Sequence, residues 1–303
     1  MLAYFIAIAT YAAFFMILAL GLNLQWGMTG LVNFGVAGFY AIGAYTSAIL
    51  VTHIGWPPEM AILAALVLTA AVGGAVGMLA RRLREDYFAI VTLGFAELAR
   101  LVMLNEDWLT EGPRGLKLDV RPFDWGFDQQ TYSTVYLAVV ISIVAIIYLL
   151  CERIARSPYG RVLRAIRADD VVAGVLGKNV FRFRVQVFAI GCGFMGIAGA
   201  LYGHYVQNIS PDTFMPMISI FIWMSVIVGG YGNNRGLLVG AGFVMLILEG
   251  SRFLGDVTTM VSTQQIASLR VILIGAILIV VLRYRPRGLM PEARFLSPFE
   301  RPD

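Results

Sequence analysis

Nine long apolar runs, separated by short polar stretches, are the feature that most limits how this chain can fold. Hydrophobic residues make up 59% of the 303 residues and charged residues only 14%, which is more apolar than ordinary soluble domains. Crossing the hydrocarbon core of a bilayer takes about 20 apolar residues, so these runs predict membrane-spanning helices. They cover residues 3–22, 33–54, 60–80, 87–104, 133–150, 185–206, 216–228, 237–254 and 268–282.

The sequence therefore predicts an all-α, polytopic helical bundle that forms one transmembrane domain over residues 1–303. We expect eight to ten spans, because the count is open at two places. The run at 216–228 is short enough to be re-entrant, and residues 21–35 are long and polar enough to contain a half-crossing helix.

A polar, glycine-rich stretch at residues 27–35 follows the first run. Its glycines weaken a helix, and lipid would leave its polar side chains unsatisfied, so we predict a broken helix that borders a translocation pathway. A second glycine-rich stretch at 229–243 resembles the first, which suggests an inverted repeat of two related halves. An ordinary turn between two spans is the alternative. The pathway residues predicted here are Gly27, Thr29, Gly30, Asn33 and Gly35.

The charged residues indicate which loops face the cytoplasm. Lys and Arg gather in loops 81–84 and 151–184 and in the tail at 283–303, whereas loop 105–132 carries six acidic and three basic residues. Because cytoplasmic loops collect Lys and Arg, we expect 151–184 and the tail to be cytoplasmic and 105–132 to be periplasmic. The N-terminus is then periplasmic with nine spans and cytoplasmic with ten. The net charge of +4 reflects this topology, so we expect no nucleic-acid partner.

Residues 151–184, which we call the docking segment, form a basic island with eight Lys or Arg between two apolar runs. Ser157 can cap a short helix, and Asp169 or Asp170 can cap a second one. Gly177 is a natural stop for that second helix, because glycine adopts the left-handed turn of a helix C-terminus. Such ordered capping favours two short helices that dock on a partner. A basic loop that only orients the protein in the membrane is the alternative.

The first of these two helices is amphipathic. Val162, Leu163 and Ile166 form an apolar stripe beside a row of arginines. We predict that this helix inserts into a groove of a cytoplasmic partner, with the stripe as its anchor and the arginines pairing at the rim. The residues assigned to docking are Ser157, Gly160, Arg161, Arg164, Ile166, Arg167, Asp169, Asp170 and Gly177.

The chain lacks the sequence features of an ATPase. Its one Gly-Lys dipeptide, at 177–178, is followed by Asn and has no upstream glycine of a phosphate-binding loop. We expect no catalytic residue and no metal site, with ATP and magnesium bound by separate subunits. Within the apolar runs, Glu97 with Arg100 and Glu249 with Arg252 are spaced to neutralise each other.

This pairing favours a pathway driven by an external ATPase over an ion-driven carrier, which needs uncompensated carboxylates near mid-membrane. We expect Glu97 and Arg100 to face the protein interior, away from lipid. Glu97 is also a candidate for the translocation pathway, because it lies near the middle of its span.

Six longer motifs occur in order along the chain. They are GLNLQWGMTGLVNFGVAGFYAIGAYTSAIL (21–50), LREDYFAIVTLGFAELARLVMLN (83–105), LTEGPRGL (109–116), SPYGRVLRAIRADDVVAGVLGKN (157–179), VGGYGNNRGLLVGA (228–241) and RPRGLMPE (285–292). Together they resemble the LivM-type permease subunits of ATP-binding-cassette importers for branched-chain amino acids. One departure lies after the first span, where the family often reads Gly-Gln-Leu-Ser-Leu-Gly-His and this chain reads Gly-Leu-Val-Asn-Phe-Gly-Val.

The resemblance implies one half of a pore in the bacterial inner membrane, paired with a homologous LivH-type permease and surrounded by lipid. It also implies two cytoplasmic ATPase subunits and a periplasmic protein that delivers leucine, isoleucine or valine. The coupling segment of the family corresponds to residues 157–177. Because of the departure at 30–36, urea, short amides and other amino acids stay open as substrates. A secondary transporter or channel without an ATPase, and a scaffold subunit that only completes the pore, are rival hypotheses.

Overall fold

The computed structural model describes residues 2–81, 83–123, 126, 128–257, 263–285 and 288–292. Two subjects of the sequence predictions lie outside the described residues and side chains. One is the pairing of Glu249 with the side chain of Arg252, and the other is the tail beyond Glu292.

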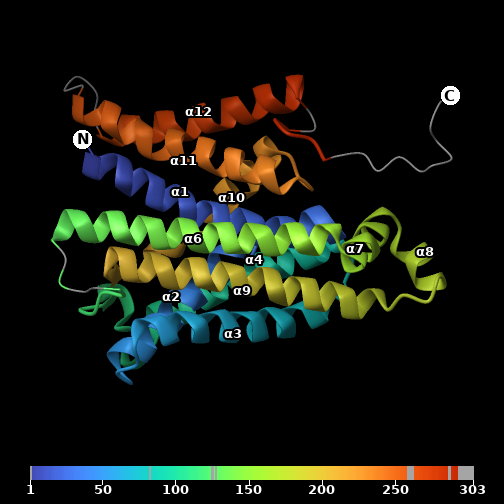
Figure 1. Ribbon diagram of the computed structural model, residues 1–303, viewed down its shortest axis with the longest axis horizontal. Helices are drawn as coiled ribbons and strands as arrows, with labels where there is room; N and C mark the ends of the chain where they lie inside the picture. The colour runs from blue at the N-terminus through green and yellow to red at the C-terminus, as the bar shows by residue number, and fades with distance from the viewer. Residues whose placement is uncertain are drawn as a thin grey trace.

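Long helices run side by side along the longest direction of the molecule (Figure 1). Apolar runs of this length form helices because a helix satisfies its backbone N–H and C=O groups internally. Among the described residues, five helices are long and apolar enough to cross a membrane, and three apolar helices are shorter. The predicted all-α membrane bundle is confirmed. The main helices of the bundle are α1 (Leu2–Leu22), α2 (Val36–Thr52), α3 (Pro58–Gly77), α4 (Glu85–Asn105), α6 (Gln129–Arg156), α9 (Val180–Val206), α10 (Pro216–Gly229), α11 (Asn234–Val257) and α12 (Thr263–Tyr284).

Short elements lie at the two ends of the bundle (Figure 1). At one end, which we call the sheet end, α5 (Asp107–Thr110) precedes β1 (Leu116–Lys117), and β1 pairs antiparallel with β2 (Asn208–Ile209). At the opposite end, the α8 end, α7 (Pro158–Ala168) and α8 (Asp170–Val175) project beyond the long helices. Helix α1 begins at the sheet end and α12 finishes at the α8 end (Figure 1), so these two helix ends lie at opposite ends of the bundle.

Glycines let the central helices approach each other closely. A Cβ at Gly43 of α2 would overlap the backbone of Gly196 in α9, and a Cβ at Gly199 of α9 would overlap the backbone of α2. On the other side, a Cβ at Gly73 of α3 would collide with Cys192 of α9. In a membrane, small residues at such contacts allow the backbone packing that holds helices together. Helix α9 is therefore the support on which α2 and α3 are positioned.

The second span begins later than the predicted 33–54, because the chain is broken before it. A π-helical turn (Asn23–Gly27) ends α1, the chain remains helical to Thr29, and residues 30–35 are non-helical. The break predicted within 27–35 is confirmed. The second glycine-rich stretch also contains a break, at residues 230–233 between α10 and α11. The inverted repeat stays a prediction.

Candidate functional site

Helix α7 follows α6 directly and has the predicted capping residue. The side-chain oxygen of Ser157 accepts a hydrogen bond from the backbone N–H of Gly160 at 3.2 Å. Glycine is required at position 160, because a Cβ there would collide with the carbonyl oxygens of Ile154 and Ala155 at the end of α6. The local sequence therefore fixes the turn between the two helices.

Helix α8 is capped at both ends, as predicted. Oδ1 of Asp169 accepts a hydrogen bond at 2.9 Å from a backbone N–H of the first turn, so Asp169 is the N-cap. The carboxylate of Asp170 instead lies 3.2 Å from the guanidinium of Arg184. Gly177 has a φ of +77°, and the N–H that follows it donates back to the carbonyl of Ala173 at 3.1 Å. This is the left-handed stop that a glycine provides.

The apolar stripe of α7 faces the protein's own bundle. Leu163 and Ile166 are 0% and 1% exposed, so neither can anchor in a partner's groove, and that prediction is wrong. The ring of Tyr159 packs on Phe183 of α9 with centroids 5.1 Å apart, and burial raises the pKa of its hydroxyl. The stripe was correctly recognised as apolar, but it is removed from water by covering the end of this bundle.

Two of the predicted rim arginines also bind within the chain. Arg164 donates to a carbonyl oxygen at the end of α6 at 3.0 Å. Arg167 lies 2.6 Å from the carboxylate of Glu292 and donates to the carbonyl of Gly27. Both side chains are partly exposed as well, so their pairing with a partner stays a prediction. Arg161 is exposed.

Helix α8 carries apolar side chains that this chain leaves uncovered. Val171, Val172, Val175 and Leu176 are 71%, 53%, 84% and 72% exposed. They form two pairs spaced by four residues, which places them on one side of the helix, whereas Ala173 is buried. We call these four residues the apolar face of α8. An apolar patch on a capped, projecting helix is typical of an interaction surface.

Buried amide side chains hold the non-helical residues 30–35 in place. Nε2 of Gln25 donates to the carbonyl of Phe188 at 3.0 Å, and Oε1 of Gln25 accepts from Nδ2 of Asn33 at 2.8 Å. Oδ1 of Asn33 accepts from the N–H of Gly35 at 2.7 Å. Both amide side chains are fully buried. Asn33 was predicted to line a pathway, but both the nitrogen and the oxygen of its amide form hydrogen bonds that hold residues 30–35 in place.

Neighbouring helices supply further partners for this backbone. The N–H of Phe34 donates to Oγ1 of Thr92 at 3.0 Å, and the indole of Trp223 donates to the carbonyl of Asn33 at 2.8 Å. Thr92 lies seven residues after the start of α4, which is about 10 Å along the helix axis. Residues 30–35 therefore return into the bundle, where protein satisfies the polar backbone groups that lipid could not.

The outer side of residues 30–35 is apolar and aromatic. Side chains alternate along it as in an extended strand, so that Val32 and Phe34 are partly exposed. Phe34 stacks on Trp223 with ring centroids 4.9 Å apart, and Trp223 packs on Trp26 at 4.6 Å. Of the predicted pathway residues on this stretch, Gly30 is partly exposed and the others are buried: Gly27, Thr29, Asn33 and Gly35.

Glu97 pairs with Arg100, as their spacing predicted. The closest nitrogen and oxygen are 2.6 Å apart, and Asp212 lies 3.6 Å from the same guanidinium. The side chains of Glu97 and Arg100 are 38% and 16% exposed, so this chain covers most of Arg100 and part of Glu97, and the prediction that the pair faces away from lipid stays a prediction. Leu98 and Leu101 beside it are 61% and 43% exposed.

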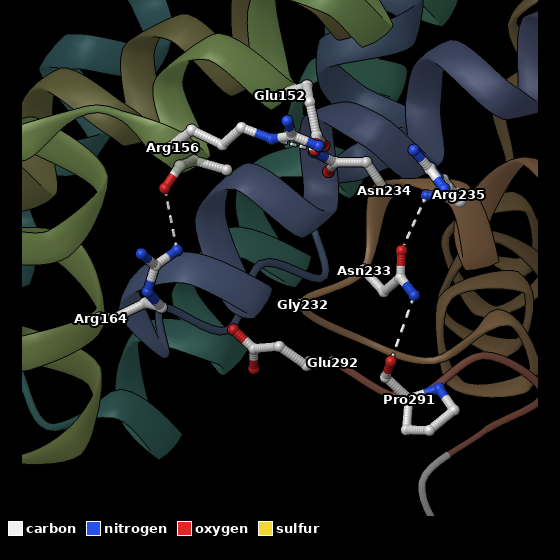
Figure 2. Close-up of a pocket in the computed structure, with 10 residues that line it drawn as sticks. Glu152, Arg156, Arg164, Gly232, Asn233, Asn234, Arg235, Pro291 and Glu292 are labelled. Carbon is white, nitrogen blue, oxygen red and sulfur yellow. Dashed lines mark hydrogen bonds and ion pairs between the residues drawn. The ribbon is translucent and has the colours of Figure 1, made fainter. Parts of the chain in front are cut away.

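A cavity of about 500 Å³ opens at the α8 end between α6, α7 and the turn before α11 (Figure 2). Inside it, Glu152 forms an ion pair with Arg156 at 2.6 Å and accepts a hydrogen bond from Asn234 at 3.1 Å. The residues that line the cavity are Glu152, Ala155, Arg156, Arg164, Gly232, Asn233, Asn234, Arg235, Pro291 and Glu292.

Comparison with known proteins identifies the family. The sequence profile described as branched-chain amino acid transport system, permease component, matches residues 4–282. The chain belongs to this permease family. The high-affinity branched-chain amino acid transport system permease protein LivM of Salmonella typhimurium is 30% identical, over 95% of this chain and 70% of that protein.

Two further relatives extend the similarity within this permease family. The probable LivM permease of Methanocaldococcus jannaschii is 26% identical, over 93% of this chain and 92% of the relative. The LivH permease of Escherichia coli is 27% identical, over 93% of this chain and 91% of the relative. No solved structure matches the chain significantly.

The groups of this permease that connect the break to the docking segment could not be predicted from local sequence. Asn23 binds Asn234 at 3.0 Å, and Glu292 binds Arg167, across more than a hundred residues of sequence. Asn234 and Glu292 lie within the motifs at 228–241 and 285–292, and membership in those motifs was their only signal. Spacing could not reveal them, because their partners are distant in the chain.

Proposed function

We propose that this permease forms one half of the translocation pore of an ATP-binding-cassette importer for leucine, isoleucine and valine. Its membership of the permease family over residues 4–282 carries the proposal. Relatives named LivM and LivH are similar over 95% and 93% of this chain, which supports a homologous LivH-type subunit as the other half. The proposal puts the chain in a bacterial inner membrane, with the sheet end periplasmic and the α8 end and tail cytoplasmic.

In this proposal two cytoplasmic ATPase subunits bind ATP and magnesium, and a periplasmic binding protein delivers the amino acid. The apolar face of α8 is the contact that we assign to an ATPase subunit. We expect this face to insert into an apolar groove of the ATPase subunit, since burying an exposed Val or Leu side chain contributes about 1.5–3 kcal/mol. The caps at Asp169 and Gly177 hold α8 in its bound shape beforehand, which lowers the entropic cost of docking.

We assign the translocation route to the outer side of residues 30–35. Val32, Phe34 and Trp223 offer an apolar surface there, which suits a branched aliphatic side chain. Urea and short amides have no apolar side chain to bury against it, so this surface favours branched-chain amino acids over those solutes.

Reconstitution in proteoliposomes tests the proposed function. Vesicles that contain this chain, a LivH-type partner and the two ATPase subunits should accumulate labelled leucine when ATP is inside and the binding protein is outside. An excess of valine should compete, and an excess of urea should not. Leucine uptake driven by an ion gradient with this chain alone would refute the proposal and identify a secondary transporter. Equal uptake without this chain would show that it is not part of the pore and would also refute the proposal.

A substitution on the apolar face of α8 tests the assigned ATPase contact. Val175→Asp places a carboxylate where an apolar groove is expected, so ATP-driven uptake and co-purification of the ATPase subunits should both fall. Val120→Asp is the matched control, since Val120 is 49% exposed at the sheet end. Normal uptake and normal co-purification with Val175→Asp would show that the ATPase binds elsewhere.

A further inference from the structure

Arg167 connects three parts of the chain that are far apart in the sequence. Its guanidinium, in the last turn of α7, lies 2.6 Å from the carboxylate of Glu292 and donates a hydrogen bond to the carbonyl of Gly27. The side chains of Arg167 and Glu292 are 26% and 22% exposed, so solvent screens the pair less than it screens an exposed one. Charge-assisted bonds of this kind are among the strongest that side chains make.

The acceptor at Gly27 is a group that needs a donor. Gly27 is the last residue of the π-turn, so its carbonyl lies near the negative end of the first helix, where helical N–H donors run out. A guanidinium has five N–H groups in a rigid plane and can bind this carbonyl and Glu292 with different nitrogens. The compact ammonium of a lysine cannot hold both acceptors in that geometry.

The contact is tightly packed on the side of the π-turn, whereas on its other side Gly232 and Glu292 line the cavity of about 500 Å³. Oδ1 of Asn23 accepts a hydrogen bond from the N–H of Gly232 at 2.8 Å. A Cβ at Gly27 would lie 2.9 Å from the backbone nitrogen of Gly232, and a Cβ at Gly232 would lie 2.5 Å from Oε2 of Glu292. Close-packed groups transmit a displacement instead of absorbing it. On the packed side, a shift of α7 would therefore be passed to the end of the π-turn.

We infer that Arg167, Gly27 and Glu292 form a coupling joint, through which movement of α7 and α8 is passed to the broken helix and so to residues 30–35. The inference rests on the proposed function, because it requires α8 to move with an ATPase subunit. Glu292 is a positioning residue, since it acts by orienting the guanidinium of Arg167. The joint also gives the C-terminal residues 288–292 a role in transport.

Glu292→Gln tests the joint, because it keeps the size of the side chain and removes its charge. In proteoliposomes with the complete transporter, we expect leucine uptake per ATP hydrolysed to fall about tenfold, which is the scale of one charge-assisted hydrogen bond. ATP hydrolysis and the amount of assembled complex should stay near wild type. A structural role alone would not change that ratio.

Two other variants make the test specific. Arg167→Lys keeps the charge opposite Glu292 but cannot also hold the Gly27 carbonyl, so we expect the same loss of uptake per ATP. Arg156→Gln is the matched control. It breaks an ion pair with Glu152 of the same 2.6 Å length at the same end of the bundle, where Arg156 is 70% exposed, and should leave the ratio unchanged.

A wild-type ratio in both Glu292→Gln and Arg167→Lys overturns the joint. A parallel loss of uptake, hydrolysis and assembled complex also overturns it, because these residues would then only stabilise the fold. Failure of the proposed function looks different, since wild-type vesicles would then show no ATP-driven uptake at all.

Discussion

Removing the charges of Glu97 and Arg100 one at a time should cost unequal amounts of folding free energy. The guanidinium of Arg100 lies 2.6 Å from Glu97 and 3.6 Å from Asp212. Glu97→Gln leaves Arg100 with Asp212 as a remaining partner, whereas Arg100→Gln leaves two carboxylates near each other without a cation. We therefore expect Arg100→Gln to be the more destabilising change.

The exposure of the pair sets the size of these losses. With Glu97 38% and Arg100 16% exposed, the pair lies between two limits. An exposed pair is worth about 0.2–1 kcal/mol, and removing one partner of a buried pair costs about 3–5 kcal/mol. We expect about 0.5 kcal/mol for Glu97→Gln and about 1.5 kcal/mol for Arg100→Gln, because Arg100 keeps Asp212 as a partner when the charge of Glu97 is removed. The double variant should lose about 0.5 kcal/mol less than the sum, which is the coupling between the two residues.

Unfolding in mixed detergent micelles, followed by circular dichroism as the denaturing detergent is increased, measures these free energies. Lys117→Gln is the matched control, because it breaks a pair with Asp119 in which both side chains are more than 75% exposed, at 76% and 81%. Its expected cost is below about 0.3 kcal/mol.

Three outcomes would contradict or redirect this reasoning. Additive losses would show that Glu97 and Arg100 do not interact. A cost above about 3 kcal/mol for Glu97→Gln would mean that the pair is shielded from water as in a protein interior. A loss of leucine uptake with unchanged stability would assign Glu97 to the translocation route.

Two further substitutions test the docking segment and the broken helix. Gly160→Ala should displace α7 from the end of α6, so ATP-driven uptake should be lost while circular dichroism shows unchanged helix content; normal uptake would contradict this. Asn33→Leu leaves a buried acceptor and a buried donor unpaired and should cost about 1–3 kcal/mol of unfolding free energy in micelles. Asn105→Leu is its control, because that amide is exposed and bonds only within its own helix; equal losses from the two variants would contradict the role of Asn33.

The sequence by itself determined the features that depend on near neighbours. The capping roles of Ser157, Asp169 and Gly177 and the pairing of Glu97 with Arg100 each involve residues within about one or two helical turns. Such interactions follow from spacing and residue type alone, so they can be predicted without knowing the fold. The break at 30–35 was predictable for the same reason, because its glycines and polar side chains weaken the helix locally.

Only the tertiary structure decided which surfaces the chain uses for itself. The sequence pattern of an amphipathic helix predicts that its apolar face is covered, but it does not identify the covering surface. The pattern of α7 therefore could not show that Leu163 packs on its own bundle. The apolar face of α8 stays open because that helix projects beyond the bundle. Arg167 likewise forms hydrogen bonds with Gly27 and Glu292, which are 140 and 125 residues away in the sequence. No local spacing encodes such contacts, because packing of the whole bundle brings them together.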